Sequence, residues 1–153
     1  MMYQHVLVPL DGSELAERAL SDVIELSRRG CIGDVILLKV IEVKTFHPSS
    51  SGVSFDFDAL RKELHTEAGK YLEGIQARLR PEGINATTVL LDGSPAEAII
   101  EFAKNQPVDL IAISTHGYTG FKRFLLGTVA LRVIQHATAS VLLIRSGSDQ
   151  KKT

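Results

Sequence analysis

The sequence contains one cysteine, Cys31, and no tryptophan among its 153 residues. A lone cysteine excludes a disulfide framework and a cysteine metal cage. The formal net charge is only −1, so we expect no bulk attraction to nucleic acid or to an anionic membrane. No apolar run approaches the roughly 20 residues of a membrane span, and no signal-peptide pattern opens the chain. These absences favour a cytoplasmic protein.

What the chain does contain is an ordinary globular composition, with 44% hydrophobic and 23% charged residues. Its length suits one domain with a single core. Short apolar runs, separated by helical periodicity, predict buried parallel strands at 4–10, 34–41, 85–91, 108–113 and 141–144. The sequence therefore predicts one α/β domain over 1–146, followed by a polar tail at 147–153.

Helix start signals precede several of the expected helices. Ser13 is expected to cap the first helix, which ends before Gly30. Ser94 is expected to cap the third, with Pro95 at its first position and Glu97 closing a capping box. In the last helix, apolar spacing at Leu126, Ala130, Val133 and Ile134 predicts the buried face.

The longest helix is expected at 58–79, with an apolar stripe that includes Leu60 and Leu64. His65 follows Leu64 and is interpreted as a solvated surface residue. Before this helix, 42–55 has three consecutive serines and no helical period. That segment predicts a mobile linker or a flap over a site, and its composition favours disorder.

Alternation of strands and helices predicts an open five-stranded parallel sheet with helices on both faces, a Rossmann-like fold. With right-handed crossovers and one reversal, the expected strand order is 3-2-1-4-5. The loops at 9–13 and 114–128 then meet between the first and fourth strands, where ligand crevices form. Asp11 in the first loop is either a turn residue that bonds its own backbone or a ligand contact.

The second loop is rich in glycine. Gly117, Gly120 and Gly127 allow close approach of a ligand to the backbone and permit positive φ. Gly127 and Thr128 should begin the last helix, where N–H groups and the helix dipole suit a phosphate. The alternative is that these glycines only shape a tight connection. Two phosphate motifs, G-x-x-x-x-G-K-[ST] and G-x-G-x-x-G after the first strand, are absent.

Taken together, these segments resemble the universal stress protein family, in its UspA-like, ATP-binding subgroup. The resemblance covers the whole chain and is carried by V-P-L-D-G-S, V-I-L-L-K-V, G-S-P-A-E-A-I, S-T-H-G, L-L-G-T-V-A and S-V-L-L-I-R. The fold that it implies is the adenine nucleotide alpha hydrolase-like variety of the Rossmann arrangement.

ATP-binding members of that family carry G-x2-G-x9-G-[ST]. The matching string here is Ser114-x2-Gly117-x9-Gly127-Thr128, so serine replaces the first glycine. Serine is small and keeps its backbone N–H. Family members often carry histidine where Lys39 stands, and arginine or lysine where Tyr118 stands.

The resemblance implies a ligand, ATP or else AMP or ADP, with Mg²⁺ accompanying the phosphates. It implies a site whose adenosine end has Pro9, Leu10, Asp11 and Val40, and whose phosphate end has Ser114, Gly117, Gly127, Thr128 and Val129. It also implies a homodimer paired through Val141 to Ile144. The apolar character of that edge strand favours pairing independently.

Three functional hypotheses stay open: a nucleotide-binding stress or regulatory module, a weak Mg²⁺-dependent ATPase or phosphotransferase, and an interaction protein that binds no nucleotide. His116 has no evident catalytic partner in the sequence, which disfavours dedicated catalysis. The complete Gly127-Thr128 end favours the first hypothesis over the third.

Overall fold

The computed structural model describes residues 1–42, 56–115 and 127–145. Every strand and helix expected from the sequence is present within these ranges. In chain order they are β1 (Tyr3–Pro9), α1 (Glu14–Arg28), β2 (Ile32–Ile41), α2 (Phe57–Leu79) with the short 3-10 helix Arg80–Glu82, β3 (Ala86–Asp92), α3 (Pro95–Asn105), β4 (Leu110–Ser114), α4 (Thr128–His136) and β5 (Ser140–Ile144).

The strands form one parallel sheet in the order β3-β2-β1-β4-β5, as predicted. β1 lies at its centre, where Val6 is in register with Val35 of β2 on one side and Leu110 of β4 on the other. The carboxyl ends of β1, β2 and β4 therefore lie at the same edge of the sheet. Crevices between the loops that follow such strands are the usual ligand sites of this architecture.

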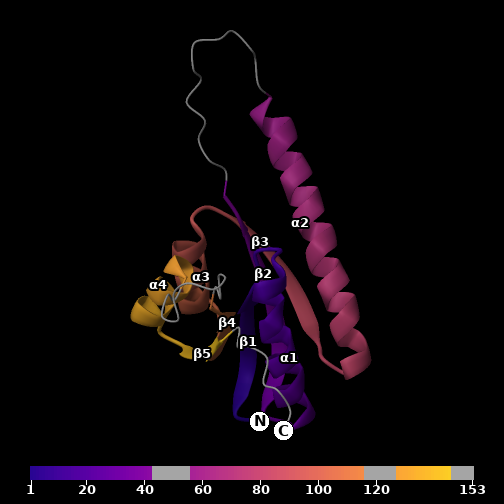
Figure 1. The fold of residues 1–153 in the computed structure, drawn as a ribbon, viewed down its shortest axis with the longest axis vertical. Coiled ribbons are helices and arrows are strands. Elements are labelled where there is room, and N and C mark those ends of the chain that lie inside the picture. Colours follow the sequence, from indigo (N-terminus) through magenta and orange to yellow (C-terminus); the bar gives the residue numbers. More distant parts are fainter. Residues whose placement is uncertain (43–55, 116–126, 146–153) are drawn as a thin grey trace, which may run out of the picture.

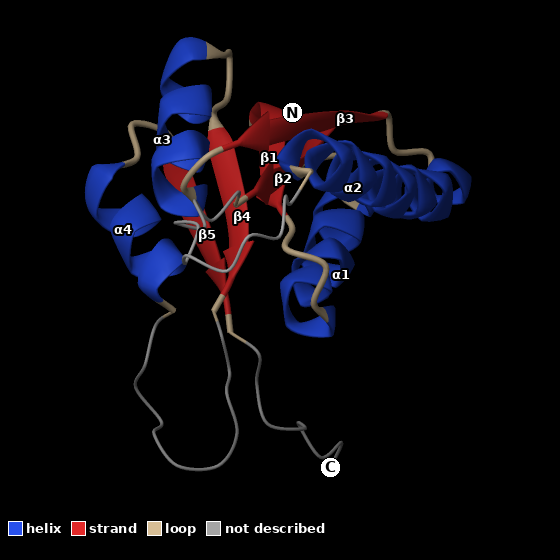
Figure 2. Cartoon of the chain, turned by 90° about the horizontal axis from the view of Figure 1, so that it is seen from above, coloured by secondary structure: helices blue, strands red, loops and turns tan. Residues whose placement is uncertain are grey.

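Helices cover both faces of the sheet (Figure 2). Alternate residues of β1 divide between the two layers, because successive side chains of a strand point to opposite faces. Val6 and Val8 pack in the cluster under α1 and α2, whereas Leu7 packs in the cluster under α3 and α4. All three are fully buried, which explains why β1 reads as a continuous apolar run.

The predicted helix starts are only partly correct. The Ser13 side chain caps α1, since its Oγ accepts a hydrogen bond from the N–H of Ala16 at 3.1 Å. Ser94 occupies the N-cap of α3 without a side-chain bond to the backbone. Its hydroxyl instead donates to Oε2 of Glu97 at 2.7 Å. The expected capping box is thus replaced by a side-chain pair.

Fewer apolar residues of α2 and α4 are buried than the spacing predicts. Leu60 is 38% exposed, because the first turns of α2 project beyond the sheet (Figure 1). In α4, Ala130 and Val133 are buried as expected, but Ile134 is 40% exposed. Residue spacing alone therefore predicted more buried apolar residues on both helices than the structure has.

Several sequence predictions fall outside the described residues. They concern the linker or flap at 42–55 apart from Glu42, the loop residues Gly117 and Gly120, and the tail at 147–153. The helices of the described ranges include none with the length and apolarity that a bilayer span requires.

Candidate functional site

The loop after β1 forms a tight, hydrogen-bonded turn. The N–H of Leu10 donates to the carbonyl of Leu38 at 2.8 Å, and the chain then leaves the sheet. Oδ1 of Asp11 accepts hydrogen bonds from the backbone N–H and the hydroxyl of Ser13, at 2.8 and 2.6 Å. Gly12 between them has φ +92°, a conformation that side chains disfavour. Of the two roles that the sequence left open for Asp11, its side chain takes the turn role.

The residues expected at the adenosine end differ in how exposed their side chains are. Pro9 and Leu10 are buried, with Leu10 packed in the core beneath α1 and α2. Only the backbone of these two residues can face a ligand at the sheet edge. Asp11 is exposed and Val40 is half-buried, so their side chains are the accessible ones in this group.

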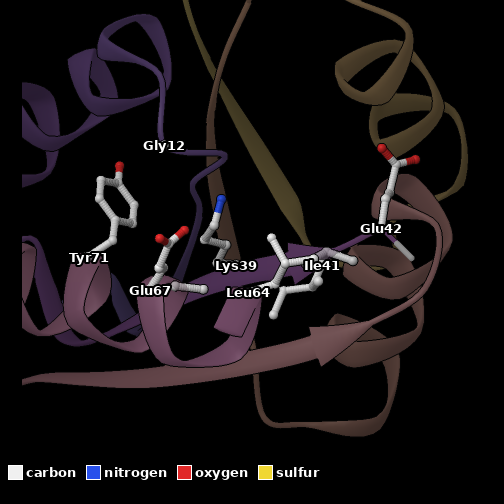
Figure 3. Close-up of a pocket in the computed structure, with 9 residues that line it drawn as sticks. Gly12, Lys39, Ile41, Glu42, Leu64, Glu67 and Tyr71 are labelled. Atoms are coloured by element: carbon white, nitrogen blue, oxygen red, sulfur yellow. The ribbon is translucent and has the colours of Figure 1, made fainter. Parts of the chain in front are cut away.

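A pocket of about 380 Å³ opens beside this loop, at the carboxyl end of β2 (Figure 3). Its size lies within the range of small-molecule sites. Val40 is the predicted site residue that lines it. The other lining residues come from the loop, from the end of β2 and from α2: Gly12, Lys39, Ile41, Glu42, Leu64, Glu67, Ala68 and Tyr71.

The contribution of α2 was missed by sequence reasoning. Leu64 was assigned to the packing stripe of that helix, and neither Ala68 nor Glu67 was expected at a site. The only sequence signal available was their position on one helical face, which packing also explains. Ile41 and Leu64 give the middle of the pocket an apolar lining (Figure 3). Glu67 adds a carboxylate near Lys39.

Lys39 crosses from β2 to the loop after β1. Its Nζ donates a hydrogen bond to the carbonyl oxygen of Asp11 at 2.9 Å. The same ammonium lies 5.7 Å from the ring centroid of Tyr71 on α2, within the range of a cation–π contact. One side chain thus connects a strand, a loop and a helix around the pocket.

The Tyr71 ring is itself fixed to α1. Its hydroxyl donates to Oε1 of Glu17 at 3.0 Å, and Nη1 of Arg78 donates to Oε2 of the same carboxylate at 2.7 Å. Burial, together with the Glu17 carboxylate, raises the pKa of Tyr71 well above its ordinary value. The phenol therefore stays protonated and keeps donating to Glu17 at neutral pH.

The expected phosphate end lies at the ends of β4 and α4. Ser114 ends β4, and Gly127 is the N-cap of α4 with no side-chain capping bond. Gly127 has φ −55°, so it does not use the positive φ that glycine would permit. Thr128 begins the helix, and Val129 packs against the core under α3 and α4. The N–H groups of this first turn are suited to an anion.

A charged cluster lies at the end of β3. His65 is not simply solvated as predicted, because its Nε2 is 2.6 Å from Oδ1 of Asp92. Arg61 pairs with the other carboxylate oxygen. Burial raises the pKa of Asp92, but the hydrogen bonds from Arg61 and His65 outweigh it, so the pKa lies below its ordinary value. Within the described ranges, no three or more His, Cys, Asp or Glu residues converge as metal ligands.

Comparison with known proteins adds a family match. Residues 2–145 match the model of the universal stress protein family. Universal stress protein YxiE of Bacillus subtilis is 30% identical over 148 residues, covering 94% of this chain and all of the relative. The solved structure of MJ0577, from Methanocaldococcus jannaschii, is 31% identical, with a TM-score of 0.78 over 97% of this chain and 100% of that one.

A more distant solved structure carries a ligand. It is a universal stress protein family member from Arabidopsis thaliana with AMP bound, 20% identical to this chain. Its TM-score is 0.64, and the match covers 98% of this chain and 96% of that one. This likeness concerns the fold.

Proposed function

We propose, on the premise that this chain belongs to the universal stress protein family, that it binds adenine nucleotides as a stress-response or regulatory module. ATP is the ligand we favour, with AMP or ADP as weaker alternatives. The pocket at the carboxyl end of β2 carries this proposal. A bound AMP in the related Arabidopsis thaliana structure supports it.

The pocket has the chemistry that an adenosine needs. Its apolar middle, with Ile41 and Leu64, suits the faces of a purine ring (Figure 3). The exposed carboxylate of Asp11 suits ribose hydroxyls, and Val40 would lie beside the base. Pro9 and Leu10 would contribute backbone only, since both are buried.

The phosphates would lie toward the start of α4. Gly127 brings no side chain to this point, and Thr128 offers a hydroxyl beside the first N–H groups of the helix. The helix dipole favours a negative charge there. We place Ser114, Gly117 and Val129 around the same phosphates, and Mg²⁺ with the β- and γ-phosphates of ATP.

We also propose that the protein acts in the cytoplasm as a homodimer that pairs through Val141 to Ile144. β5 ends the sheet, with β4 as its neighbour within the chain. Its apolar residues Val141, Leu142 and Leu143 are only half-buried. An apolar edge strand that is left uncovered tends to pair with another chain.

The proposal is tested by identifying what the purified protein carries. The protein is denatured, and the released small molecules are separated and identified by mass spectrometry. We expect an adenine nucleotide, in an amount that falls sharply in a Gly127→Val variant purified in parallel. Release of no nucleotide after purification in the presence of ATP, or of guanine nucleotides instead, would contradict the proposal.

A further inference from the structure

Lys39 holds the loop that follows β1. This loop begins where the sheet ladder ends, at the Leu10 to Leu38 hydrogen bond. The Lys39 ammonium reaches the next residue, Asp11, and bonds its carbonyl oxygen at 2.9 Å. Figure 3 shows the Lys39 side chain directed at the loop beside Gly12. A Cβ added to Gly12 would lie 3.6 Å from Nζ, so the ammonium also lies close to this residue of the loop.

The hydrogen bonds inside the turn do not join it to β2. The two hydrogen bonds from Ser13 to Asp11 lie inside the turn and fix its shape. They do not fix where the turn sits relative to β2. Beyond the Leu10 to Leu38 bond at its start, the bond from Lys39 links the turn to β2, and Lys39 is itself paired with Leu90 of β3. A hydrogen bond from a charged donor is stronger than one between neutral groups.

The Lys39 ammonium also contacts the aromatic ring of Tyr71. The ring lies 5.7 Å from Nζ, and the Tyr71 hydroxyl is tied to Glu17 in the first turn of α1. Arg78 holds the other oxygen of Glu17 at 2.7 Å. The ring therefore cannot turn away without breaking a hydrogen bond between α1 and α2. A fixed ring keeps the Lys39 side chain aimed at the loop.

We propose that Lys39 is a positioning residue for the nucleotide site: through the Asp11 carbonyl it holds the loop after β1 in the conformation that receives the adenosine. The inference rests on the proposed function. It assigns no contact between Lys39 and phosphate. Preorganisation of a loop raises affinity because the ordering cost is met before the ligand arrives.

The experiment compares Lys39→Met with Lys39→Arg. Methionine keeps most of the side-chain length and removes the charge and the donor, whereas arginine retains both. Binding of ATP and of uncharged adenosine is measured by titration calorimetry. In ligand-free protein, the amide exchange rates of Gly12 and Ser13 are measured by NMR, with β3 amides as the internal control.

For Lys39→Met we expect about a tenfold loss of affinity, the size of one hydrogen bond from a charged donor. The loss should be equal for ATP and adenosine, since positioning does not depend on the phosphates. Exchange of Gly12 and Ser13 should rise by about threefold or more, while β3 amides stay unchanged. Lys39→Arg should restore both properties to near the parent values.

Three results would overturn the inference. A loss confined to ATP would show that Lys39 attracts the phosphates directly. Unchanged exchange at Gly12 and Ser13 in Lys39→Met would show that the loop does not depend on Lys39. Faster exchange with unchanged affinity would show that holding the loop does not serve binding. If the parent binds neither ATP nor adenosine, the proposed function fails, and the exchange rates alone decide whether Lys39 holds the loop.

Discussion

The hydroxyl of Ser114, at the end of β4, donates a hydrogen bond to the carbonyl oxygen of Ala16 in α1, 3.4 Å away. Ser114 stands where the family motif has glycine. Its side chain is directed at α1, on the same face of the sheet as Ala112, which packs in the cluster under α1 and α2. The Ser114 side chain therefore links β4 to α1 by a hydrogen bond and does not project into the ligand crevice.

Replacing this serine should affect stability more than binding. We expect Ser114→Gly to bind ATP as tightly as the parent or more tightly, because the side chain that is lost faces α1. The free energy of unfolding should fall by about 1 kcal/mol, since one hydrogen bond is lost and glycine adds chain entropy. Calorimetric titration and urea unfolding measure the two effects. Binding weakened by tenfold would show that the Ser114 hydroxyl contacts the ligand.

Gly127 should be the residue of the site that tolerates change least. Gly127→Val places a branched side chain at the N-cap of α4, where the phosphates need bare N–H groups. The backbone there has φ −55°, which valine can adopt, so the variant should fold. We expect ATP binding to be lost while circular dichroism is unchanged.

A matched control for this substitution is Gly74→Val. Gly74 is exposed on α2, with open space around its Cα, so the same change there should leave binding intact. If Gly127→Val binds ATP as well as Gly74→Val does, the phosphates do not lie at the start of α4.

The Arg61–Asp92–His65 cluster should make the free energy of unfolding fall as the pH is lowered. The folded state lowers the pKa of Asp92, so the ionised carboxylate stabilises the protein above the ordinary aspartate value of about 3.9. That contribution is lost as the pH falls below this value and Asp92 takes up a proton. Being partly exposed, the cluster should contribute no more than about 1 kcal/mol.

The measurement is urea unfolding of the parent and of Asp92→Asn from pH 7 to pH 3. The variant should be less stable at pH 7, and the difference should shrink below pH 4. Asp22→Asn, at an exposed position of α1, serves as the control and should show no such trend. A difference for Asp92→Asn that stays constant with pH would show that the ion pairs add nothing to stability.

A charge in β5 should separate the proposed dimer. The parent should scatter light as a particle of twice the 16.7 kDa chain mass at micromolar concentration. Leu142→Lys places an ammonium on the edge strand and should reduce the mass to that of one chain. Leu60→Lys, at an exposed position of α2 away from β5, should remain dimeric. A monomeric parent would refute the dimer.

The strands could be predicted because burial on both faces leaves continuous apolar runs, as in 6–8 of β1. Their order followed from right-handed crossovers and one reversal of the chain. The helix starts were predictable where a residue acts locally, as Ser13 does. Ser94 is the N-cap of α3 and Pro95 its first residue, as predicted, but the Ser94 hydroxyl donates to the Glu97 side chain, so the expected capping box does not form.

The side-chain contacts beside the pocket and at the end of β3 were harder to predict because they join residues that are far apart in the sequence. Lys39 and Asp11 are 28 positions apart, and His65 and Asp92 are 27 apart. Periodicity predicts which face of a helix is apolar. It does not predict which polar side chains of other elements come within hydrogen-bonding distance. Val40 was placed at the site by resemblance, whereas Glu67 and Tyr71 required the structure.

The most direct test of the account is the titration of ATP into the parent protein by calorimetry, with GTP and Gly127→Val as the comparisons. We expect saturable binding of one ATP per chain, much weaker binding of GTP, and no measurable heat of binding with Gly127→Val. Absence of ATP binding by the folded parent would contradict this expectation and would favour an interaction protein that binds no nucleotide.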